Sequence, residues 1–598
     1  MTGLVDAPLA RWERWFLLAA LSLGAALRLA FLWEFRASPF FDFPVLDSLE
    51  YLMWAREIQG GQLLWDHVHI HSPLYPYVLS ALLSVSGDSL AFVRVVQALG
   101  VGLGSCVVYW AIARRCAGPV AGAVAVAIGA TLWPLVYQDS EILVESLVLL
   151  LNGGALLSLI HARGRSGWLL AAGLLLGLSA AARPNAAAFV PLAALWAAWG
   201  KDGGPARRRI LRFALVGLGA ALVIVPIVAR NHAVSGAWVA QANTWLAFYE
   251  GNNPEADGTA NMRGGRPWQR FATLAEREGI TTVEGKDRYY RGRALDWWRD
   301  RPADALRLLG KKIYLVWCAY ETRTSLNTYY FRDLSRVLSL PWPGFGLLTP
   351  LALLGVLASA LRRRRETTLL VVYAFTYTLA TAAFMAGGRY RIPIAAAAIP
   401  LAGVGVAWLV EAARGGRRGL AAAGIAGVLL LVTAFRFVPA DVVIREYGDE
   451  RYNLGTILMA LGRTDEAEAA LRKARIDRPV DGRIPNNLGV IMLKTGRVPE
   501  SLPLFRDAVR LYPELAEAWS NLGTAAAATG LPDEARRAYE TSLGLASENG
   551  MTHLAYGLFL YDQGNADAGR AHIAMAQGFG APLTPKARAI LAGPGAQR

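Results

Sequence analysis

The sequence predicts an all-α protein in which a polytopic membrane module is followed by a solenoid of helical repeats. Apolar runs of about 20 residues recur along the first three quarters of the chain, and this is the length that crosses a bilayer as a helix. The composition is 54% hydrophobic and the mean hydropathy is +0.31. After Pro439 the apolar runs stop and a repeat of about 34 residues begins.

Eleven apolar segments are expected to cross the membrane. They lie near 15–33, 89–113, 118–137, 140–161, 167–182, 185–199, 208–230, 341–361, 367–386, 391–411 and 418–437. Basic residues between these segments, such as Arg207–Arg209 and Arg362–Arg365, give the positive-inside pattern and account for much of the net charge of +15. The pattern argues against a nucleic-acid partner. It places the N-terminus in the cytoplasm and the repeats outside, with long external loops at 34–88 and 231–340.

Two further apolar stretches are expected to lie on the membrane surface. Residues 73–86 are short for a crossing, and the basic loops fall on one side only if this stretch does not span. The stretch 306–320 carries Lys311 and Lys312 near its middle and is interpreted as interfacial. In the first external loop, 47–59 reads as a short amphipathic helix that ends at Gly60-Gly61.

The C-terminal repeats have the tetratricopeptide period. The triplet Asn-Leu-Gly recurs at 453–455, 487–489 and 521–523, and glycine recurs at 462, 496, 530 and 564. We expect a membrane domain over 1–437, a linker over 438–449 and a repeat domain over 450–585. The repeat domain contains three clear units and a degenerate fourth at about 552–580. Such solenoids present a concave surface that binds partners.

The first external loop gathers ionisable residues beside the membrane, where such groups usually mark function. On a helix, Asp47, Glu50 and Tyr51 share one face. Partial desolvation at the interface makes Asp47 a candidate general base. The alternative is that these residues form the solvated face of an interfacial helix.

A second acidic group opens the predicted span 140–161. Glu141 and Glu145 are spaced i,i+4, so both charges would need a cationic or hydrogen-bonding partner. Capping of the helix N-terminus by acids is the alternative, and it suits Asp139 better than Glu145.

Several arginines lie at outer ends of spans, where the positive-inside pattern disfavours them. Arg183 lies at a turn, and Arg389, Tyr390 and Arg391 follow Gly387-Gly388. A phosphate near the outer leaflet would account for these arginines, because the guanidinium is a planar bidentate donor. The alternative is snorkelling of the side chain, which we favour for Arg28.

The alternation of His67, His69 and His71 places the three rings on one side of an extended strand. Such spacing can bind a metal, but no carboxylate spacing supports it. We expect hydrogen bonds to substrate hydroxyls or interfacial packing, and no metal or other cofactor. The three cysteines form no metal spacing and no disulfide framework.

These motifs together resemble bacterial glycosyltransferase family 39, which has the GT-C fold. The resemblance covers about 12–435. The matching positions are Asp47-Ser48-Leu49-Glu50-Tyr51, Ala55, Gly60, Ser72-Pro73-Leu74-Tyr75-Pro76, Glu145 and the Arg-Tyr-Arg of 389–391. The family has an Asp-Glu pair in the first motif, whereas this chain has Ser48 at the second position. Asp47 is therefore the sole match to the pair.

The resemblance implies a multi-pass enzyme of the bacterial inner membrane that moves a sugar from a polyprenyl-phosphate donor to an acceptor hydroxyl on the non-cytoplasmic face. In the inverting displacement that we expect, Asp47 is the base, Glu145 orients hydroxyl groups, and Arg389 and Arg391, with Arg183, stabilise the phosphate. Glu50, Tyr51, His71, Glu141 and Tyr390 are expected to line the substrate site.

The acceptor is left open by the sequence. Enzymes that join such a module to tetratricopeptide repeats occur among protein O-mannosyltransferases, so a protein acceptor held by the repeats is expected, with glycan and lipid acceptors as alternatives. Two non-transferase functions also stay open. One is a membrane-anchored repeat scaffold for envelope assembly. The other is a transporter of lipid-linked sugars, which would place charges at midplane breaks in helices.

Overall fold

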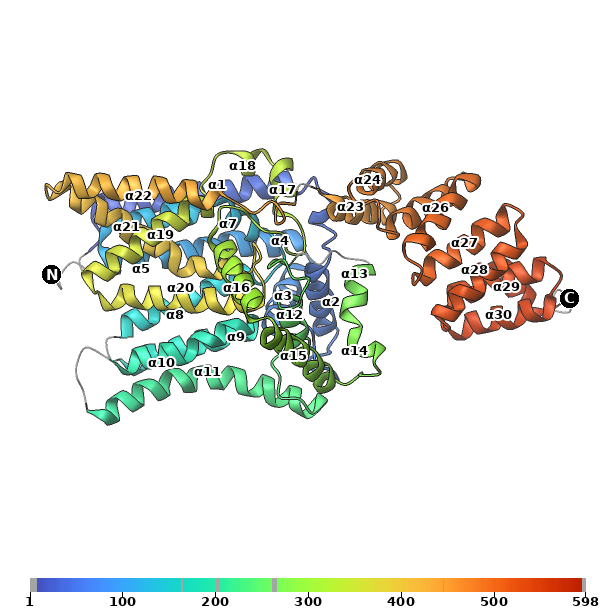
Figure 1. Ribbon diagram of the computed structural model, residues 1–598, viewed down its shortest axis with the longest axis horizontal. Coiled ribbons are helices and arrows are strands. Elements are labelled where there is room, and N and C mark those ends of the chain that lie inside the picture. The colour runs from blue at the N-terminus through green and yellow to red at the C-terminus, as the bar shows by residue number, and fades with distance from the viewer. Residues whose placement is uncertain (1–7, 163–164, 200–204, 261–265, 445, 594–598) are drawn as a thin grey trace. The chain divides into compact units, whose positions relative to one another are not determined.

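The computed structural model describes residues 8–162, 165–199, 205–260, 266–444 and 446–593. The regular structure of these residues is helical, and the one β-bridge among them joins Thr259 and Ala386. The chain divides into two units (Figure 1). The first is the membrane module, and the second runs from Glu446 onward and also takes in α13 (Arg266–Ala272) as far as Phe271. The all-α class predicted from the sequence is confirmed.

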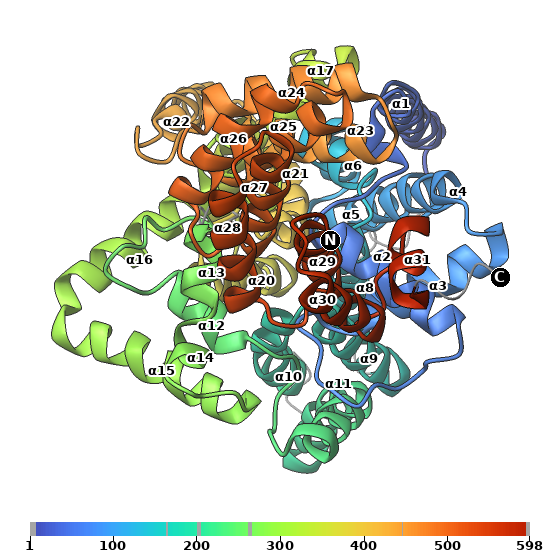
Figure 2. The same cartoon turned by 90° about the vertical axis from the view of Figure 1, so that its right-hand side faces the viewer.

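The membrane module is a bundle of roughly parallel helices, with short helices gathered at one end of it (Figure 1). Figure 2 looks along the same bundle. Its long helices are α1 (Arg11–Phe35), α4 (Leu90–Val95) continued through η3 (Val96–Gly102) into α5 (Leu103–Ala117), α6 (Pro119–Thr131), α8 (Glu145–Ala162), α9 (Ser166–Ala182), η4 (Pro184–Phe189) continued into α10 (Val190–Ala198), α11 (Ala206–Ser235), α19 (Phe345–Arg362), α20 (Arg365–Phe384), η5 (Ile392–Ile394) continued into α21 (Ala395–Arg414), and α22 (Arg418–Arg436).

Among the described residues, eight helices are long and apolar enough to cross a membrane. Shorter apolar helices lie at Leu74–Ser86, Pro119–Thr131, Ser166–Ala182 and Pro184–Ala198. The eleven predicted crossings use the eight long helices and the last three short ones. The count of eleven stays a prediction, because helix length and composition alone define these candidates.

Glycines let several of these helices approach closely. A Cβ atom on Gly173 of α9 would lie 2.2 Å from the carbonyl oxygen of Val216 in α11, and one on Gly355 of α19 would lie 1.9 Å from that of Leu401 in α21. Small residues at such crossings are typical of helix pairs in membranes, where van der Waals packing rather than water exclusion drives association. Substitution by alanine would force the helices apart at these points.

The first external loop contains two short helices, as the sequence predicts. Helix α2 spans Asp47–Gln59 and ends at Gly60, and α3 spans Leu74–Ser86. Buried Tyr51 and Leu52 of α2 pack with Tyr75 and Leu79 of α3 in one apolar cluster that also takes in residues 142–144. This packing anchors the start of α2 beside the start of α8.

The second external loop is helical for much of its length. Its helices are α12 (Thr244–Glu250), α13, α14 (Leu274–Arg277), α15 (Val283–Asp300), α16 (Pro302–Trp317), α17 (Thr328–Leu334) and α18 (Arg336–Ser339), and its residues 261–265 lie outside the described part. The loop is tied to the end of α20. Asn252 Nδ2 donates to the carbonyl oxygen of Ala383 at 2.8 Å, and the amide of Ala386 donates to that of Gly258 at 2.9 Å.

Three expectations from the sequence differ from the structure around the start of α8. The predicted span 140–161 begins as a helix only at Glu145. Glu141 lies in an irregular segment before it, so Glu141 and Glu145 do not share a helix face. Asp139 caps no helix there and instead pairs with Arg28 at 2.8 Å. The snorkelling expected of Arg28 is therefore wrong, since its side chain is fully buried. Arg94 is also buried and donates to the carbonyl oxygen of Phe41 at 3.0 Å.

The repeat unit is a run of paired helices. They are α23 (Gly448–Ala460), α24 (Thr464–Asp477), α25 (Arg483–Lys494), α26 (Val498–Leu511), α27 (Ala516–Ala528), α28 (Pro532–Leu545), α29 (Gly550–Asp562), α30 (Ala566–Gly578) and α31 (Pro585–Ala592). Gly462, Gly496, Gly530 and Gly564 end the first helix of each pair with φ of 72°, 75°, 74° and 84°, a conformation that favours glycine. The fourth pair, expected to be degenerate, is a complete helical hairpin.

The predicted linker 438–449 is packed over its first part. Val442 belongs to the core of the membrane module, and the hydroxyl of Tyr320 exchanges hydrogen bonds with the backbone of Ile444. Residue 445 lies outside the described part. Helix α31 extends the repeat unit past residue 585.

Candidate functional site

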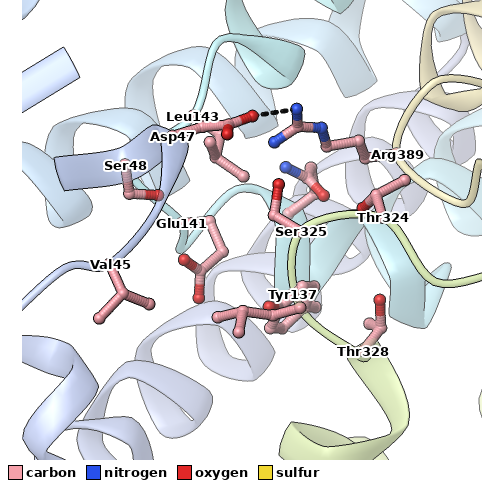
Figure 3. Close-up of a pocket in the computed structure, with 12 residues that line it drawn as sticks. Val45, Asp47, Ser48, Tyr137, Glu141, Leu143, Thr324, Ser325, Thr328 and Arg389 are labelled. Carbon is pink, nitrogen blue, oxygen red and sulfur yellow. Dashed lines mark hydrogen bonds and ion pairs between the residues drawn. The ribbon is translucent and has the colours of Figure 1, made fainter. Parts of the chain in front are cut away.

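Asp47 is the first residue of α2 and meets Arg389 from the loop between α20 and η5 (Figure 3). Residue 46 before it has a positive φ of 55°, which turns the chain sharply into the helix. Arg389 Nη2 donates to Asp47 Oδ2. Burial opposes ionisation of Asp47, but Arg389, His71 and Arg183 outweigh it and lower the pKa of the carboxyl group to about 2. Asp47 is therefore ionised at neutral pH.

Glu145 brings a second carboxylate to the same place. It is fully buried at the first position of α8, and its Oε1 accepts a hydrogen bond from Arg183 Nη2. The same oxygen lies 3.5 Å from Arg389 Nε. Two carboxylates and two guanidinium groups thus form one charge cluster, defined here as Asp47, Glu145, Arg183 and Arg389.

The charge cluster leaves donor capacity unused. Arg389 Nη1 and Arg183 Nε are buried atoms that have no hydrogen-bond partner among the described residues. Tyr390 lies between the two arginines, with its ring centroid 4.9 Å from Arg183 Cζ and 5.2 Å from Arg389 Cζ. Cation–π contacts of this kind hold guanidinium groups in place without using their N–H groups. The cluster can therefore accept a further anionic group.

Aromatic and imidazole rings cover the cluster on the side of the first loop. The ring centroids of Tyr51 and His71 lie 4.9 Å apart, and those of Tyr51 and Tyr75 lie 5.2 Å apart. Burial raises the pKa of the Tyr51 hydroxyl above its ordinary value, so the hydroxyl stays protonated. His71 Nε2 lies 2.8 Å from Glu50 Oε2, and the Glu50 side chain is exposed whereas that of His71 is largely buried.

A narrow cavity of about 30 Å³ lies beside the Asp47–Arg389 pair (Figure 3). Its lining includes the side chains of Ser48, Gln138, Glu141, Thr324, Ser325 and Thr328. Glu141 therefore faces the same space as Asp47, although it is not on α8. By volume the cavity has room for about two water molecules, and its hydroxyl and amide groups can form hydrogen bonds with a polar group.

Arg391 is not part of the charge cluster. Its side chain is buried beneath the loop, where Nη1 donates to the carbonyl oxygen of Cys318 at 2.6 Å and Nη2 donates to Glu321 Oε1. The guanidinium also lies 3.9 Å from the ring centroid of Phe345. Arg391 thus secures the loop that carries Arg389, and the sequence pattern alone did not separate the two arginines.

Several neighbours of the cluster were missed by the sequence analysis. Gln138 Nε2 donates to Glu145 Oε2 at 3.4 Å. Asn185 follows Arg183 by two residues, and its Oδ1 accepts a hydrogen bond from the hydroxyl of Tyr377 at 3.0 Å. Glu250 at the end of α12 is electrostatically coupled to the cluster: burial, Asp257 and Asp47 together raise the pKa of its carboxyl group to about 7. Uncharged residues give no signal in sequence, and Glu250 lies in the long loop 231–340, whose helix α12 the sequence analysis did not predict.

An apolar groove of about 420 Å³ lies between α10 and α20. Ala188 and Leu192 line one side, and residues of α20 from Val371 to Ala380 line the other. The Tyr377–Asn185 hydrogen bond joins the same two segments, next to Arg183. The groove therefore runs along the same two segments as this hydrogen bond, and its lining suits a hydrocarbon chain.

The three histidines of the first loop have separate surroundings. His67 Nδ1 lies 2.9 Å from Asp66 Oδ1 on the surface, whereas the ring of His69 stacks on Trp54 with centroids 3.6 Å apart. His71 faces Glu50. Within the described residues, no group of three or more His, Cys, Asp and Glu side chains is arranged to hold a metal ion.

Comparison with known families finds matches in both parts of the chain. Residues 70–229 match the model of the dolichyl-phosphate-mannose-protein mannosyltransferases. Residues 452–516 and 520–585 match the tetratricopeptide repeat. The membrane part thus has the character of a GT-C glycosyltransferase, and the C-terminal part consists of tetratricopeptide repeats, as the sequence predicts. Together with the apolar helices, the first match indicates a multi-pass membrane protein.

Solved structures match a smaller part of the chain. PilF of Pseudomonas aeruginosa is 19% identical over 30% of this chain and 76% of its own, with a TM-score of 0.22. The repeat protein YrrB is 17% identical over 29% of this chain and 83% of its own, with a TM-score of 0.21. A repeat protein of Thermus thermophilus is 24% identical over 24% of this chain and 79% of its own, with a TM-score of 0.22. No curated protein sequence matches this chain.

Proposed function

We propose that the protein transfers a sugar from a polyprenyl-phosphate donor to an acceptor hydroxyl at the outer face of the bacterial inner membrane. The observation that carries this proposal is the charge cluster, in which Arg389 Nη1 and Arg183 Nε are buried without hydrogen-bond partners. A phosphate group would use these donors, because guanidinium binds phosphate through paired N–H groups. The apolar groove between α10 and α20 provides a place for the polyprenyl chain beside them.

In the proposed reaction, the acceptor hydroxyl oxygen attacks the anomeric carbon of the sugar and the bond from that carbon to the phosphate oxygen breaks. The hydroxyl proton passes to Asp47, and the lipid phosphate leaves with the bonding electron pair. Arg389 and Arg183 stabilise the charge that develops on the phosphate. Attack opposite to the leaving group inverts the configuration of the anomeric carbon.

Donor binding would also prepare the base. In the resting site Arg389 holds the pKa of Asp47 at about 2, so Asp47 is a weak base. A phosphate that competes for Arg389 weakens this ion pair and adds a like charge, and both effects raise the pKa of Asp47. Proton transfer thereby becomes favourable only when the donor is bound. Arginines supply the positive charge for the phosphate in this proposal, so it requires no metal ion.

Glu145 and the residues around it would hold the sugar. Glu145 keeps Arg183 in position and, with Gln138, offers acceptors to hydroxyl groups. Tyr390, Tyr51 and His71 enclose the cluster, and Glu50 orients His71. Glu141 and Ser325 line the narrow cavity next to Asp47. The repeats would hold a protein that carries or accompanies the acceptor, because solenoids of this type bind proteins.

The test is an assay of the purified full-length protein with a polyprenyl-phosphate sugar. Polyprenyl-phosphate mannose is the first donor to try, because mannose is the sugar of the matched family. We expect acceptor-dependent release of the lipid phosphate, and mass spectrometry of the cell envelope should show a glycan that disappears with the gene. Unchanged envelope glycans and no donor turnover with any lipid-linked sugar would favour a scaffold instead.

A further inference from the structure

A second cavity, of about 230 Å³, lies between the first external loop and the outer end of α11. Trp54, Trp65, His69 and Tyr77 line it from the loop, and Pro226, Ile227, Arg230 and Asn231 line it from α11. Its volume is far above the roughly 15 Å³ that one water molecule requires. His71 also lines it and faces Glu50, so the cavity reaches toward the charge cluster.

Aromatic rings line this cavity, and Trp65 stands nearly perpendicular to both Trp54 and Tyr77. The ring centroids of Trp54 and Trp65 lie 5.1 Å apart at 88°, and the ring of His69 stacks on Trp54 at 19°. Trp65 and Tyr77 lie 6.4 Å apart at 76°. The cavity therefore presents flat apolar faces rather than the flexible aliphatic lining of the groove between α10 and α20.

Two polar ring atoms of residues that line this cavity lack hydrogen-bond partners among the described residues. Trp54 Nε1 and His69 Nε2 are buried atoms without a partner in the described part of the chain. Leaving a buried polar group unpaired costs about 1–3 kcal/mol. Burial, with His67 and Arg230 nearby, lowers the pKa of His69 to about 4, so its ring is neutral at pH 7 and can donate or accept a hydrogen bond.

Hydrogen bonds between the first loop and the segments around α11 hold the cavity open. Arg230 donates from Nη1 to the carbonyl oxygen of His67 at 3.0 Å and from Nη2 to that of Trp65. The amide of Ala242 donates to the carbonyl oxygen of His69 at 2.8 Å, and Ser72 Oγ donates to Gln241 Oε1 at 2.8 Å. The segment that carries the histidines is thus fixed between α11 and residues 239–242, and a ligand need not order it on binding.

These features select one ligand chemistry. A hydrocarbon chain or an aromatic side chain would fill the cavity but leave Trp54 Nε1 and His69 Nε2 unpaired. A phosphate would find the Arg230 guanidinium already committed to carbonyl oxygens. A sugar ring satisfies both requirements, because its C–H face packs on aromatic rings and its hydroxyl edge pairs with polar atoms.

We propose that this cavity, defined as the aromatic pocket, binds a sugar ring of the acceptor and presents its hydroxyl past His71 to Asp47. The inference rests on the proposed transfer reaction and adds that the acceptor is a saccharide, free or carried on another molecule. The donor sugar would lie next to its phosphate at Arg389 and Arg183. The enzyme would therefore join one sugar to another.

The test uses the full-length protein with methyl glycosides as probes. Saturation-transfer NMR on the Asp47→Asn variant measures glycoside binding without turnover. We expect Trp54→Phe, which removes the indole N–H together with the five-membered ring that carries it, and His69→Asn each to weaken binding at least tenfold. His67→Asn is the matched control, because His67 is a surface residue of the same strand and does not line the pocket. Gel filtration checks that each variant is folded.

Equal binding by all variants, or equal loss in the His67→Asn control, would overturn the proposal. In turnover assays the acceptor KM should rise at least tenfold in the pocket variants, with the donor KM changing less than twofold. A rise in donor KM instead would mean that the pocket holds the donor sugar. Competition by sugar-free peptides would mean that it holds a peptide side chain. If the protein binds glycosides in this pocket but turns over no donor, the proposed transfer reaction is rejected and the proposed sugar binding is retained.

Discussion

Arg28 and Arg389 are both buried arginines that pair with an aspartate, but the two regions around them differ. All three nitrogen atoms of the Arg28 guanidinium have partners, namely Asp139 Oδ2 and the carbonyl oxygens of Gly24, Ala130 and Gly129. Arg389 donates one hydrogen bond, to Asp47, and its Nη1 has no partner in the described part of the chain. Full pairing is typical of a structural ion pair, whereas the unpaired donor of Arg389 calls for an explanation, which a bound anion would supply.

The largest expected effect comes from removing the carboxylate partner of Arg389. Asp47→Asn keeps the shape of the side chain and removes the proton acceptor, so kcat should fall by roughly 10²–10⁴-fold. Donor KM should not rise, because the variant removes the group that competes with phosphate for Arg389. Steady-state kinetics on the purified variant measures both values. Near-normal kcat would exclude Asp47 as the base, and a large rise in donor KM would make it a binding residue.

The second effect separates the two arginines directly. Arg389→Lys keeps a positive charge but loses the forked donor, so turnover should fall by roughly 10²-fold or more while the protein stays folded. Arg28→Met leaves Asp139 buried without a cation and should destabilise the protein by about 3–5 kcal/mol. Thermal unfolding in detergent and activity are measured for both. Asp139→Asn added to Arg28→Met is the control, and it should recover part of the stability.

The comparison fails if the two variants behave alike. Loss of folding in Arg389→Lys would mean that the charge cluster is a structural device of the same kind as the Arg28–Asp139 pair. Loss of activity without loss of stability in Arg28→Met would mean that Arg28 has a functional role and not a structural one.

The sequence predicted the local elements well because local signals determine them. Helix α2 begins at Asp47 and ends before Gly60-Gly61, and the repeats follow their glycine period. The partners of Arg28 and Arg391 could not be predicted, because 111 and 70 residues separate them from Asp139 and Glu321. Arg389 and Arg391 have nearly the same sequence context, and only the fold assigns one to Asp47 and the other to Glu321.

Residues 140–144 misled the sequence analysis for a similar reason. They are apolar enough to extend the predicted span, but Arg94 donates to the carbonyl oxygen of Ser140 and Gln97 donates to that of Glu141. Side chains from other turns thus satisfy this backbone, so it need not be helical. Such tertiary hydrogen bonds leave no periodic pattern in the sequence.

A third, smaller effect concerns the repeats. Deleting 450–598 should spare donor binding, because the charge cluster and the groove between α10 and α20 lie in the membrane module. Transfer to the native acceptor should fall by roughly 10²-fold, since a tethered second site raises the effective concentration of a weakly bound acceptor. A small soluble acceptor is the control and should lose little. Equal loss for both acceptors would mean that the repeats support the fold of the module and not acceptor binding.

The smallest effect tests a third buried cation, which has a polar but uncharged partner. Lys312 of α16 is 1% exposed and donates from Nζ to Asn252 Oδ1 at 3.1 Å. Burial lowers the pKa of its ammonium group to about 7 from an ordinary value of 10.5. Between these two pH values the unfolded chain holds a proton that the folded protein lacks. The free energy of unfolding should therefore fall as pH decreases through this window, by at most about 1.4 kcal/mol per pH unit, and level off below about pH 7.

Lys312→Met should remove this pH dependence and stabilise the protein at neutral pH. Asn252 would keep the hydrogen bond that its Oδ1 accepts from Trp298 Nε1 at 3.1 Å, so the substitution leaves that oxygen paired. Lys311→Met is the matched control, because Lys311 is partly exposed and pairs with Asp441 at 2.6 Å. Unfolding temperatures in detergent at about pH 7 and pH 10 measure the effect. If Lys312→Met lowers stability and keeps the pH dependence, Asn252 requires the hydrogen bond from the Lys312 amine. Lys312 would then be a structural residue like Arg28, although its partner is not an acid.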